Sequence, residues 1–158
     1  MQGPGPGPSH IGAQAAPQFT AETLAGTTVR VPDDFKGQLV LVNFWATWCA
    51  PCRLEEPFIV QAYEQYRSRG LQVVGVTLDG FQRTPVARVT EFLQAHSIPW
   101  PQVYRDATAI AARYGVSAIP ASFLVDGDSG KILATGADLR GEALLKTLAK
   151  YAKNARPT

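Results

Sequence analysis

The chain of 158 residues has little sulfur and little histidine: it contains two cysteines, two histidines and one methionine. Two cysteines are too few for a disulfide-rich mini-protein, which needs several cross-links. A structural zinc site takes four ligands, so both cysteines would have to join His10, near the N-terminus, and His96, far beyond the second cysteine. The zinc hypothesis is therefore weak, and any sulfur chemistry must come from one cysteine pair.

Long apolar runs and an excess of charge are also missing. The longest strongly apolar run covers residues 39–42, whereas a helix needs about 20 apolar residues to span a membrane. The N-terminus lacks the pattern of a secretory signal peptide, in which charged residues precede an apolar stretch. With 15 basic and 13 acidic residues the net charge is +2, which gives nucleic-acid binding no electrostatic support.

Residues 1–17, MQGPGPGPSHIGAQAAP, are dominated by glycine, proline and other small residues. Such a segment has almost nothing apolar to bury, so we expect a disordered tail or linker there and one domain over residues 18–155. A glycine- and proline-rich segment behaves as a semi-extended spacer, which would suit a tether to a membrane anchor. A cloning remnant explains the same composition equally well.

Apolar periodicity and turn signals predict alternating strands and helices. A hairpin is expected over residues 19–31, and the unalternating apolar runs at 38–44 and 71–78 are typical of strands buried on both faces. Helices are predicted over residues 50–69, 84–96 (with Thr84 as N-cap), 107–114 and 140–153, and further strands over 121–125 and 131–135. Because β-α-β crossovers are right-handed, this order predicts an α/β fold with a mixed sheet and helices on both faces.

The two cysteines stand in the segment Cys49-Ala50-Pro51-Cys52, directly after a predicted buried strand and at the start of a predicted helix. Taken alone, the spacing fits half a zinc site, a disulfide or a redox-active pair. The position favours redox chemistry, because the free N–H groups and the dipole at a helix N-terminus stabilise a thiolate. A fall in the thiol pKa from about 8.5 to about 7 corresponds to roughly 2 kcal/mol. We expect Cys49 to be the exposed, attacking thiolate and Cys52 the more buried, resolving thiol.

Residues 44–53, FWATWCAPCR, resemble the active-site segment of the thioredoxin superfamily, and more narrowly that of the TlpA/ResA-like thiol–disulfide oxidoreductases related to DsbE and CcmG. Glu55 and Pro57 follow the second cysteine at the spacing of that family. Residues 118–126, AIPASFLVD, resemble its cis-proline loop and following strand. The two segments are further apart than in plain thioredoxin, which matches the family's extra strand–helix segment, expected here at 79–105.

The resemblance covers about residues 17–153 and implies a thioredoxin-like fold with a central mixed sheet, an N-terminal β-hairpin and a mid-chain strand–helix insertion. It also implies thiol–disulfide exchange, with Cys49 and Cys52 as the catalytic residues and electrons supplied by a partner protein. No bound cofactor and no metal ion are expected. Pro51 would shift the potential of the pair toward the reducing side.

The resemblance also implies roles for residues that would lie near the dithiol. Trp48 would cover the dithiol and offer a flat apolar contact to partner proteins. A cis peptide bond between Ile119 and Pro120 would lie beside the sulfurs, although X-Pro bonds in general are cis in only about 5–6% of cases. There the backbone of Ile119 would pair with an extended segment of the substrate.

Proton transfer is the step at which this sequence departs from thioredoxin. Asn43 stands where thioredoxin carries a buried aspartate, and an amide cannot act as a general base. Glu55 lies one helical turn beyond Cys52 and is the predicted substitute, while a solvated glutamate that complements the helix dipole is the alternative. Glu56 is predicted to lie at the surface, and His96 to be an ordinary helix-end residue.

The resemblance implies protein partners: a disulfide-bearing substrate and a membrane-bound or soluble thiol electron donor. It favours a reductant of exported proteins, as in cytochrome c maturation, acting as a monomer. We expect a periplasmic or other extracytoplasmic location, with a membrane anchor that is absent from this sequence. A cytoplasmic role is the alternative, because a helix-opening C-x-x-C pair works in either compartment.

Two other functions would use the same cysteine pair. A metal chaperone on this fold would carry a soft ion such as Cu(I) on both thiolates, but its relatives use a histidine late in the chain, and none follows His96. A thiol peroxidase would need a threonine in the loop of its reactive cysteine, whereas the residue before Pro51 is Ala50. Both are weaker hypotheses than disulfide exchange.

Overall fold

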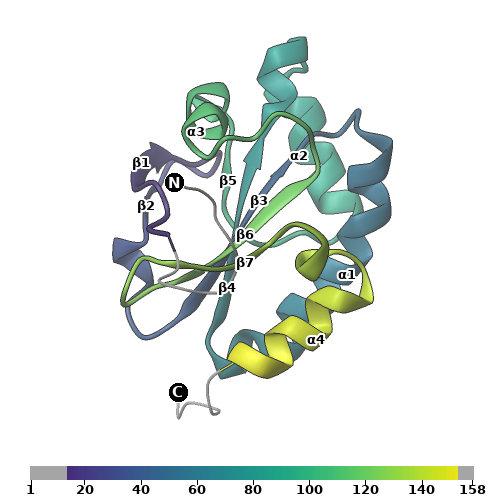
Figure 1. Ribbon diagram of the computed structural model, residues 1–158. Helices are drawn as coiled ribbons and strands as arrows, with labels where there is room; N and C mark the ends of the chain where they lie inside the picture. Colours follow the sequence, from purple (N-terminus) through teal and green to yellow (C-terminus); the bar gives the residue numbers. More distant parts are fainter. Residues whose placement is uncertain (1–13, 153–158) are drawn as a thin grey trace.

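The computed structural model describes residues 14–152. Its centre is a five-stranded sheet in the order β5-β4-β3-β6-β7 (Figure 1). β3 pairs in parallel with β4, and β4 with β5, whereas β6 and β7 pair antiparallel with their neighbours. The predicted mixed sheet is therefore confirmed. The strands span Leu39–Trp45 (β3), Leu71–Thr77 (β4), Gln102–Val103 (β5), Ala121–Asp126 (β6) and Ile132–Thr135 (β7).

Helices cover both faces of the sheet, as predicted (Figure 1). Successive side chains of a strand point to opposite faces, so the continuous apolar run of β3 supplies both layers of the core. Leu39 and Leu41 belong to the cluster that includes side chains of α1 and α4, and Val40 and Val42 to the cluster that includes those of α3. The helices span Ala50–Tyr66 (α1), Val86–Ala95 (α2), Ala107–Arg113 (α3) and Glu142–Tyr151 (α4).

An N-terminal hairpin of β1 (Phe19–Glu22) and β2 (Thr28–Val31) lies on the α3 side of the sheet (Figure 1). The segment before it is also packed. Ala16 is buried and donates its backbone N–H to the Gly130 carbonyl, and the Tyr114 hydroxyl donates to the Pro17 carbonyl at 2.8 Å. Packed structure thus already includes residues 14–17, which the sequence analysis assigned to the tail; the rest of that predicted tail lies outside the described residues.

The predicted mid-chain insertion is present between β4 and α3, and contains α2 and the short strand β5. α2 begins later than expected, and Thr84 is not its N-cap. Pro85 keeps an extended backbone with ψ of 149°, so the first helical residue is Val86. The mid-chain helix therefore begins two residues after the predicted start.

Gly75 in β4 allows the insertion to lie close against the sheet. A Cβ atom there would sit 2.1 Å from Oε1 of Gln102, so only glycine leaves room for that amide. Gln102 in turn accepts a hydrogen bond from Nε1 of Trp45 at 2.9 Å. Trp45 is buried, and the end of β3 is thereby fixed next to the cysteine segment.

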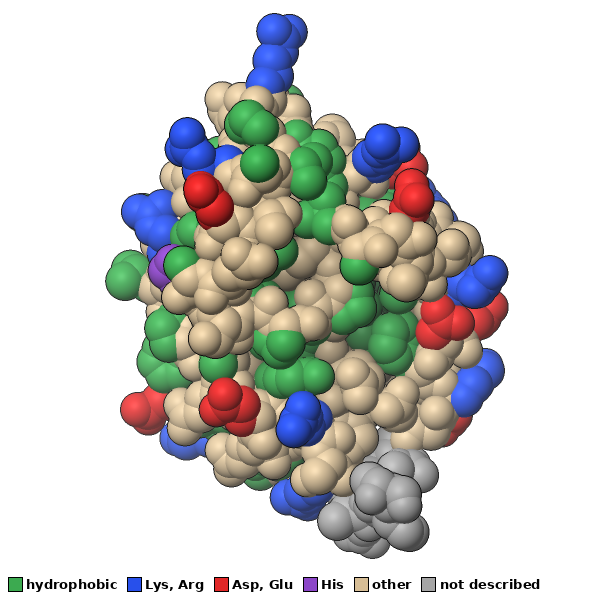
Figure 2. Space-filling view, turned by 180° about the vertical axis from the view of Figure 1, so that it is seen from behind, with side chains coloured by type: hydrophobic (Ala, Val, Ile, Leu, Met, Phe, Trp, Pro, Cys, Tyr) green, Lys and Arg blue, Asp and Glu red, His purple; other side chains and the backbone are tan. Residues whose placement is uncertain are grey.

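In the described part of the chain, no helix is both long and apolar enough to cross a membrane. Figure 2 shows acidic and basic side chains interspersed around the edge of one face, with a largely uncharged centre. This distribution agrees with the near-balance of charge in the sequence.

Candidate active site

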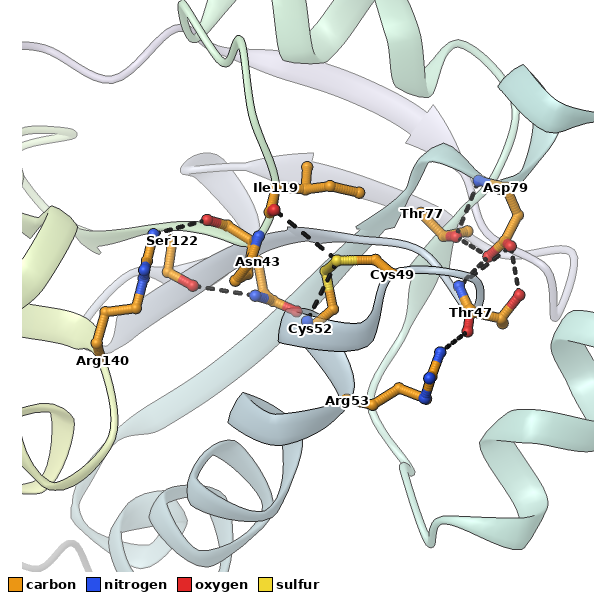
Figure 3. The surroundings of a disulfide bond; sticks show 11 residues. Asn43, Thr47, Cys49, Cys52, Arg53, Thr77, Asp79, Ile119, Ser122 and Arg140 are labelled. Carbon is orange, nitrogen blue, oxygen red and sulfur yellow. Dashed lines mark hydrogen bonds between the residues drawn. A yellow bond between two sulfur atoms is a disulfide. The ribbon is translucent and has the colours of Figure 1, made fainter.

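Cys49 and Cys52 form a disulfide immediately beyond the carboxyl end of β3, where α1 begins (Figure 3). Cys49 is the N-cap residue of α1, and its Sγ accepts a hydrogen bond from the backbone N–H of Cys52 at 3.2 Å. Pro51 lies in the first turn, where its missing N–H costs no helical hydrogen bond. The Cys49 sulfur thus occupies the place where a helix terminus stabilises negative charge.

Exposure does not distinguish the two cysteines in this oxidised state. Cys49 is 6% exposed and Cys52 is 4% exposed, so the expected exposure of the first sulfur is not seen. A disulfide accounts for this difference from the expectation, because each sulfur covers the other. Their surroundings do differ: Cys49 lies against the cis-proline loop, and Cys52 lines a small cavity.

The Ile119–Pro120 peptide bond is cis, as the resemblance implied. The carbonyl oxygen of Ile119 lies 3.8 Å from the Cys49 sulfur, and Pro120 is buried. Arg140, just before α4, donates from Nη2 to the Pro120 carbonyl at 3.0 Å (Figure 3). The loop is therefore held against the disulfide from the side of α4.

Asp79 is a site residue that the sequence reasoning missed. It is fully buried, and its carboxylate accepts hydrogen bonds from the backbone N–H and hydroxyl of Thr47 and from the hydroxyl of Thr77 (Figure 3). Arg53 adds a hydrogen bond from Nη1 to the Thr47 carbonyl at 2.9 Å. Together they fix the loop that leads from β3 into Cys49. An acidic residue just past the end of a buried parallel strand was the signal available in the sequence.

Asn43 lies on β3 below the disulfide and is 7% exposed. Its Nδ2 donates to Oγ of Ser122 on β6 at 3.0 Å (Figure 3). An amide does not act as a general base, so Asn43 cannot take the role that the buried aspartate has in thioredoxin.

Among residues 14–152 no three histidine, cysteine, aspartate or glutamate side chains are grouped so as to hold a metal ion. The cysteine pair, the helix N-terminus and the cis-proline loop lie together at the end of β3. Such a centre can exchange disulfides through Cys49 and Cys52 alone.

Comparison with known proteins identifies the family. The profile of the AhpC/TSA family matches residues 12–134. The thiol-disulfide oxidoreductase ResA of Bacillus thuringiensis subsp. konkukian is 33% identical over 142 residues, covering 90% of this chain and 77% of the relative. The chain belongs to the ResA-like thiol-disulfide oxidoreductases. ResA of Bacillus subtilis is 31% identical over 118 residues, covering 75% of this chain and 63% of that relative.

Solved structures of thiol–disulfide oxidoreductases and interchange proteins show the same fold. The thioredoxin domain of a thiol-disulfide oxidoreductase from Bacteroides vulgatus superposes with a TM-score of 0.78 at 30% identity, covering 92% of this chain and 100% of the other. A putative thiol:disulfide interchange protein DsbE from Chlorobium tepidum gives a TM-score of 0.74 at 31% identity, covering 90% of this chain and 98% of the other. These matches confirm the predicted thioredoxin-like fold and the enzyme class.

The two glutamates after Cys52 in this ResA-like chain differ in their surroundings, and Glu56 is less exposed than predicted. Glu55, the predicted proton acceptor, reaches α4 and accepts a hydrogen bond from the backbone N–H of Gly141 at 2.7 Å. Glu56, predicted to be a surface residue, has a side chain only 11% exposed and lines the same cavity as Cys52. It stands four residues after Cys52, so both side chains lie on the same face of α1.

Glu56 is paired with His96, which ends α2 and was expected to have no special contact. Nδ1 of His96 lies 3.0 Å from Oε1 of Glu56, and its ring stacks on Phe92 with centroids 4.0 Å apart. Burial raises the pKa of the Glu56 carboxyl above its ordinary value of 4.5, and the attraction of His96 offsets part of that rise.

Trp48 is 42% exposed beside the disulfide of this ResA-like site. It stands between two open grooves, one of about 610 Å³ that is bordered by α2 and one of about 310 Å³ that reaches Ile119. Phe81, which is 69% exposed, lines the second groove. Exposed aromatic side chains of this kind provide apolar contacts for a partner.

Proposed function

We propose that this oxidoreductase is a reductant of disulfides in exported proteins, including the cysteine pair of apocytochrome c. The observation that carries the proposal is the position of the Cys49 sulfur. It caps α1, accepts the Cys52 N–H and lies against the carbonyl of Ile119. The helix N-terminus and the Cys52 N–H stabilise this sulfur as a thiolate, which is the nucleophile in disulfide exchange.

The reaction proceeds in two substitutions at sulfur. The Cys49 thiolate attacks the substrate disulfide, one substrate sulfur leaves as a thiolate, and a mixed disulfide forms. The Cys52 thiolate then attacks the Cys49 sulfur, so that the bond between Cys49 and the substrate breaks and the internal disulfide forms. Two electrons pass to the substrate, and a partner thiol protein must return them.

Substrate recognition is proposed to involve Trp48 and the cis-proline loop. The exposed Trp48 ring borders a groove that extends along Ile119, whose backbone is adjacent to the Cys49 sulfur. An extended substrate segment beside Ile119 would gain backbone hydrogen bonds, and its apolar side chains would contact Trp48 and Phe81. Pro120 would keep that backbone in place, because its carbonyl is held by Arg140.

We also propose an extracytoplasmic location for this monomeric domain, held near a membrane by a further segment of the full-length protein. The resemblance to exported reductants supports this location. The cysteine content agrees with it, because a chain with one pair has no other cysteine with which that pair could form an incorrect disulfide.

A redox titration with a peptide assay tests the direction of the reaction. The Cys49–Cys52 pair is equilibrated with dithiothreitol or glutathione buffers, and the reduced protein is then mixed with a disulfide-closed peptide that carries the C-x-x-C-H haem-attachment sequence. We expect a potential toward the reducing end of the range from about −270 to about −120 mV, and stoichiometric reduction of the peptide.

Cysteine variants provide the controls for this assay. Cys49→Ser should abolish reduction, and Cys52→Ser should stop the reaction at the mixed disulfide. A potential near −120 mV, or a peptide that stays oxidised, would contradict the reductant role. Tight one-to-one binding of Cu(I) without any disulfide reduction would instead favour the metal chaperone.

A further inference from the structure

Glu56 has a carboxylate oxygen whose presence in the protein interior is not explained by its contacts. Its Oε2 atom is buried and has no hydrogen-bond partner in the described part of the chain, while Oε1 is paired with His96. A buried carboxylate oxygen without a donor is unfavourable, so such a group is seldom retained without a role. This distinguishes Glu56 from the other carboxylates near the disulfide.

The same side chain lines a cavity with Cys52. The cavity has a volume of about 20 Å³, and its polar lining comes from Asn43, Gln102 and Glu56. That volume is enough for one water molecule, which needs two to four polar partners. One water in this cavity would connect the Cys52 sulfur with the Glu56 carboxylate.

We propose that Glu56 accepts the proton of Cys52 during the resolving step and that His96 passes it to solvent. This inference rests on the oxidoreductase activity of the proposed function and assigns its proton route. His96 is suited to the second part, because its side chain is 41% exposed while its Nδ1 contacts Glu56. A proton can thus leave the interior without any movement of the sheet.

Protons and electrons both balance in the resolving step. In the mixed disulfide, the Cys52 thiol transfers its proton to the Glu56 carboxylate, and the resulting thiolate attacks the Cys49 sulfur. The bond between Cys49 and the substrate sulfur breaks, and the electron pair leaves on the substrate thiolate, which takes a proton from solvent. Glu56 then returns to the carboxylate by releasing its proton through His96.

The charges around Glu56 suit this role. Beyond Cys52, the cavity lining contributed by β3 and β5 carries no charge, since it consists of Asn43, Trp45 and Gln102. His96 at the end of α2 is the titratable group in contact with the carboxylate. Burial raises the pKa of Glu56 above 4.5, which brings it closer to that of a thiol and makes it a better proton acceptor.

The release of a coloured thiolate separates the two chemical steps. Reduced protein is mixed in a stopped-flow instrument with one equivalent of dithiobis-nitrobenzoate, an aromatic disulfide. Attack by Cys49 releases the first nitrothiobenzoate, and attack by Cys52 releases the second. In Glu56→Gln we expect an unchanged first phase and a second phase about 100-fold slower at neutral pH, the size of a general-base contribution. The second-phase rate of this variant should then rise tenfold per pH unit up to the thiol pKa.

Three further variants test whether the slower second phase is specific to Glu56. Glu64→Gln, an exposed change on the same helix, should leave both phases unaltered. His96→Gln should move the midpoint of the second-phase pH profile upward, because the attraction that lowers the pKa of Glu56 is lost. A second phase in Glu56→Gln with the wild-type pH profile would overturn the assignment. So would loss of that phase in Glu55→Gln alone. A wild-type protein without a first phase would overturn the oxidoreductase activity together with this role.

Discussion

Asp79 and Glu56 are both carboxylates near the reactive end of the sheet, but Asp79 is buried whereas the Glu56 side chain is 11% exposed, and their surroundings differ. Asp79 is 0% exposed and accepts hydrogen bonds from two hydroxyls and one backbone N–H. Within the described residues, Glu56 pairs with His96 through Oε1 and leaves Oε2 without a hydrogen-bond donor. The first carboxylate is saturated with donors and positions the loop before Cys49. The second keeps a free lone pair beside Cys52 and is available for chemistry.

Burial alone does not distinguish a carboxylate that positions a loop from one that can take part in proton transfer. A carboxylate surrounded by donors has its hydrogen-bonding capacity used and holds those donors in place. A carboxylate desolvated without donors has a raised pKa and exchanges protons readily. Counting the donors around each oxygen therefore separates a positioning residue from a candidate proton acceptor.

The largest effect on stability is expected from Asp79→Asn. The asparagine side chain has one acceptor oxygen in place of two, and its NH₂ group would face the donors of Thr47 and Thr77. At least one of these donors therefore loses its partner. Urea unfolding of the oxidised protein should show a loss of about 3 kcal/mol. The exposed change Glu64→Gln is the control. A loss below about 1 kcal/mol would mean that Asp79 does not hold the loop.

Glu56→Gln should change the pH dependence of stability instead. The pKa of Glu56 is raised in the folded protein, so its stabilising contribution is complete below pH 4.5 and is lost as pH rises through the folded pKa. Relative to wild type, the variant should therefore gain stability when the pH is raised from 4.5 to neutral. Urea midpoints of both oxidised proteins at the two pH values measure this, and parallel curves would contradict the raised pKa.

Glu55→Gln should have the smallest effect. Glu55 accepts the N–H of Gly141, the N-cap residue of α4, so its charge complements the dipole of that helix. The glutamine retains an acceptor oxygen and loses only the charge, which is worth about 0.5–1 kcal/mol. The thermal midpoint at low and high salt provides the measurement, since screening should shrink the difference. A difference that grows with salt would rule out this electrostatic origin.

The sheet and the dithiol could be predicted because their signals are local. Unalternating apolar runs mark β3 and β4, and the spacing of Cys49 and Cys52 marks the first turn of a helix. The cis state of the Ile119–Pro120 bond came from the resemblance, since X-Pro bonds as a class are rarely cis.

The roles of the acidic residues could not be predicted because they depend on distant segments. With 3.6 residues per turn, positions three and four after Cys52 both lie near its face of the helix. Glu55 accepts a hydrogen bond from the start of α4, and Glu56 pairs with His96 at the end of α2. No pattern within α1 encodes either neighbour. Asp79 likewise needs the adjacency of the ends of β3 and β4.

Arg140 and Gly141 are consecutive residues that bind two different parts of the site. Arg140 holds the carbonyl of Pro120, and the Gly141 N–H is held by Glu55 on α1. Any displacement of the cis-proline loop by a bound substrate is thus transmitted through one peptide unit to a charged hydrogen bond. The Gly141 amide should therefore serve as a spectroscopic reporter: its nitrogen and proton resonances should move when a substrate occupies the loop, although no substrate atom touches it.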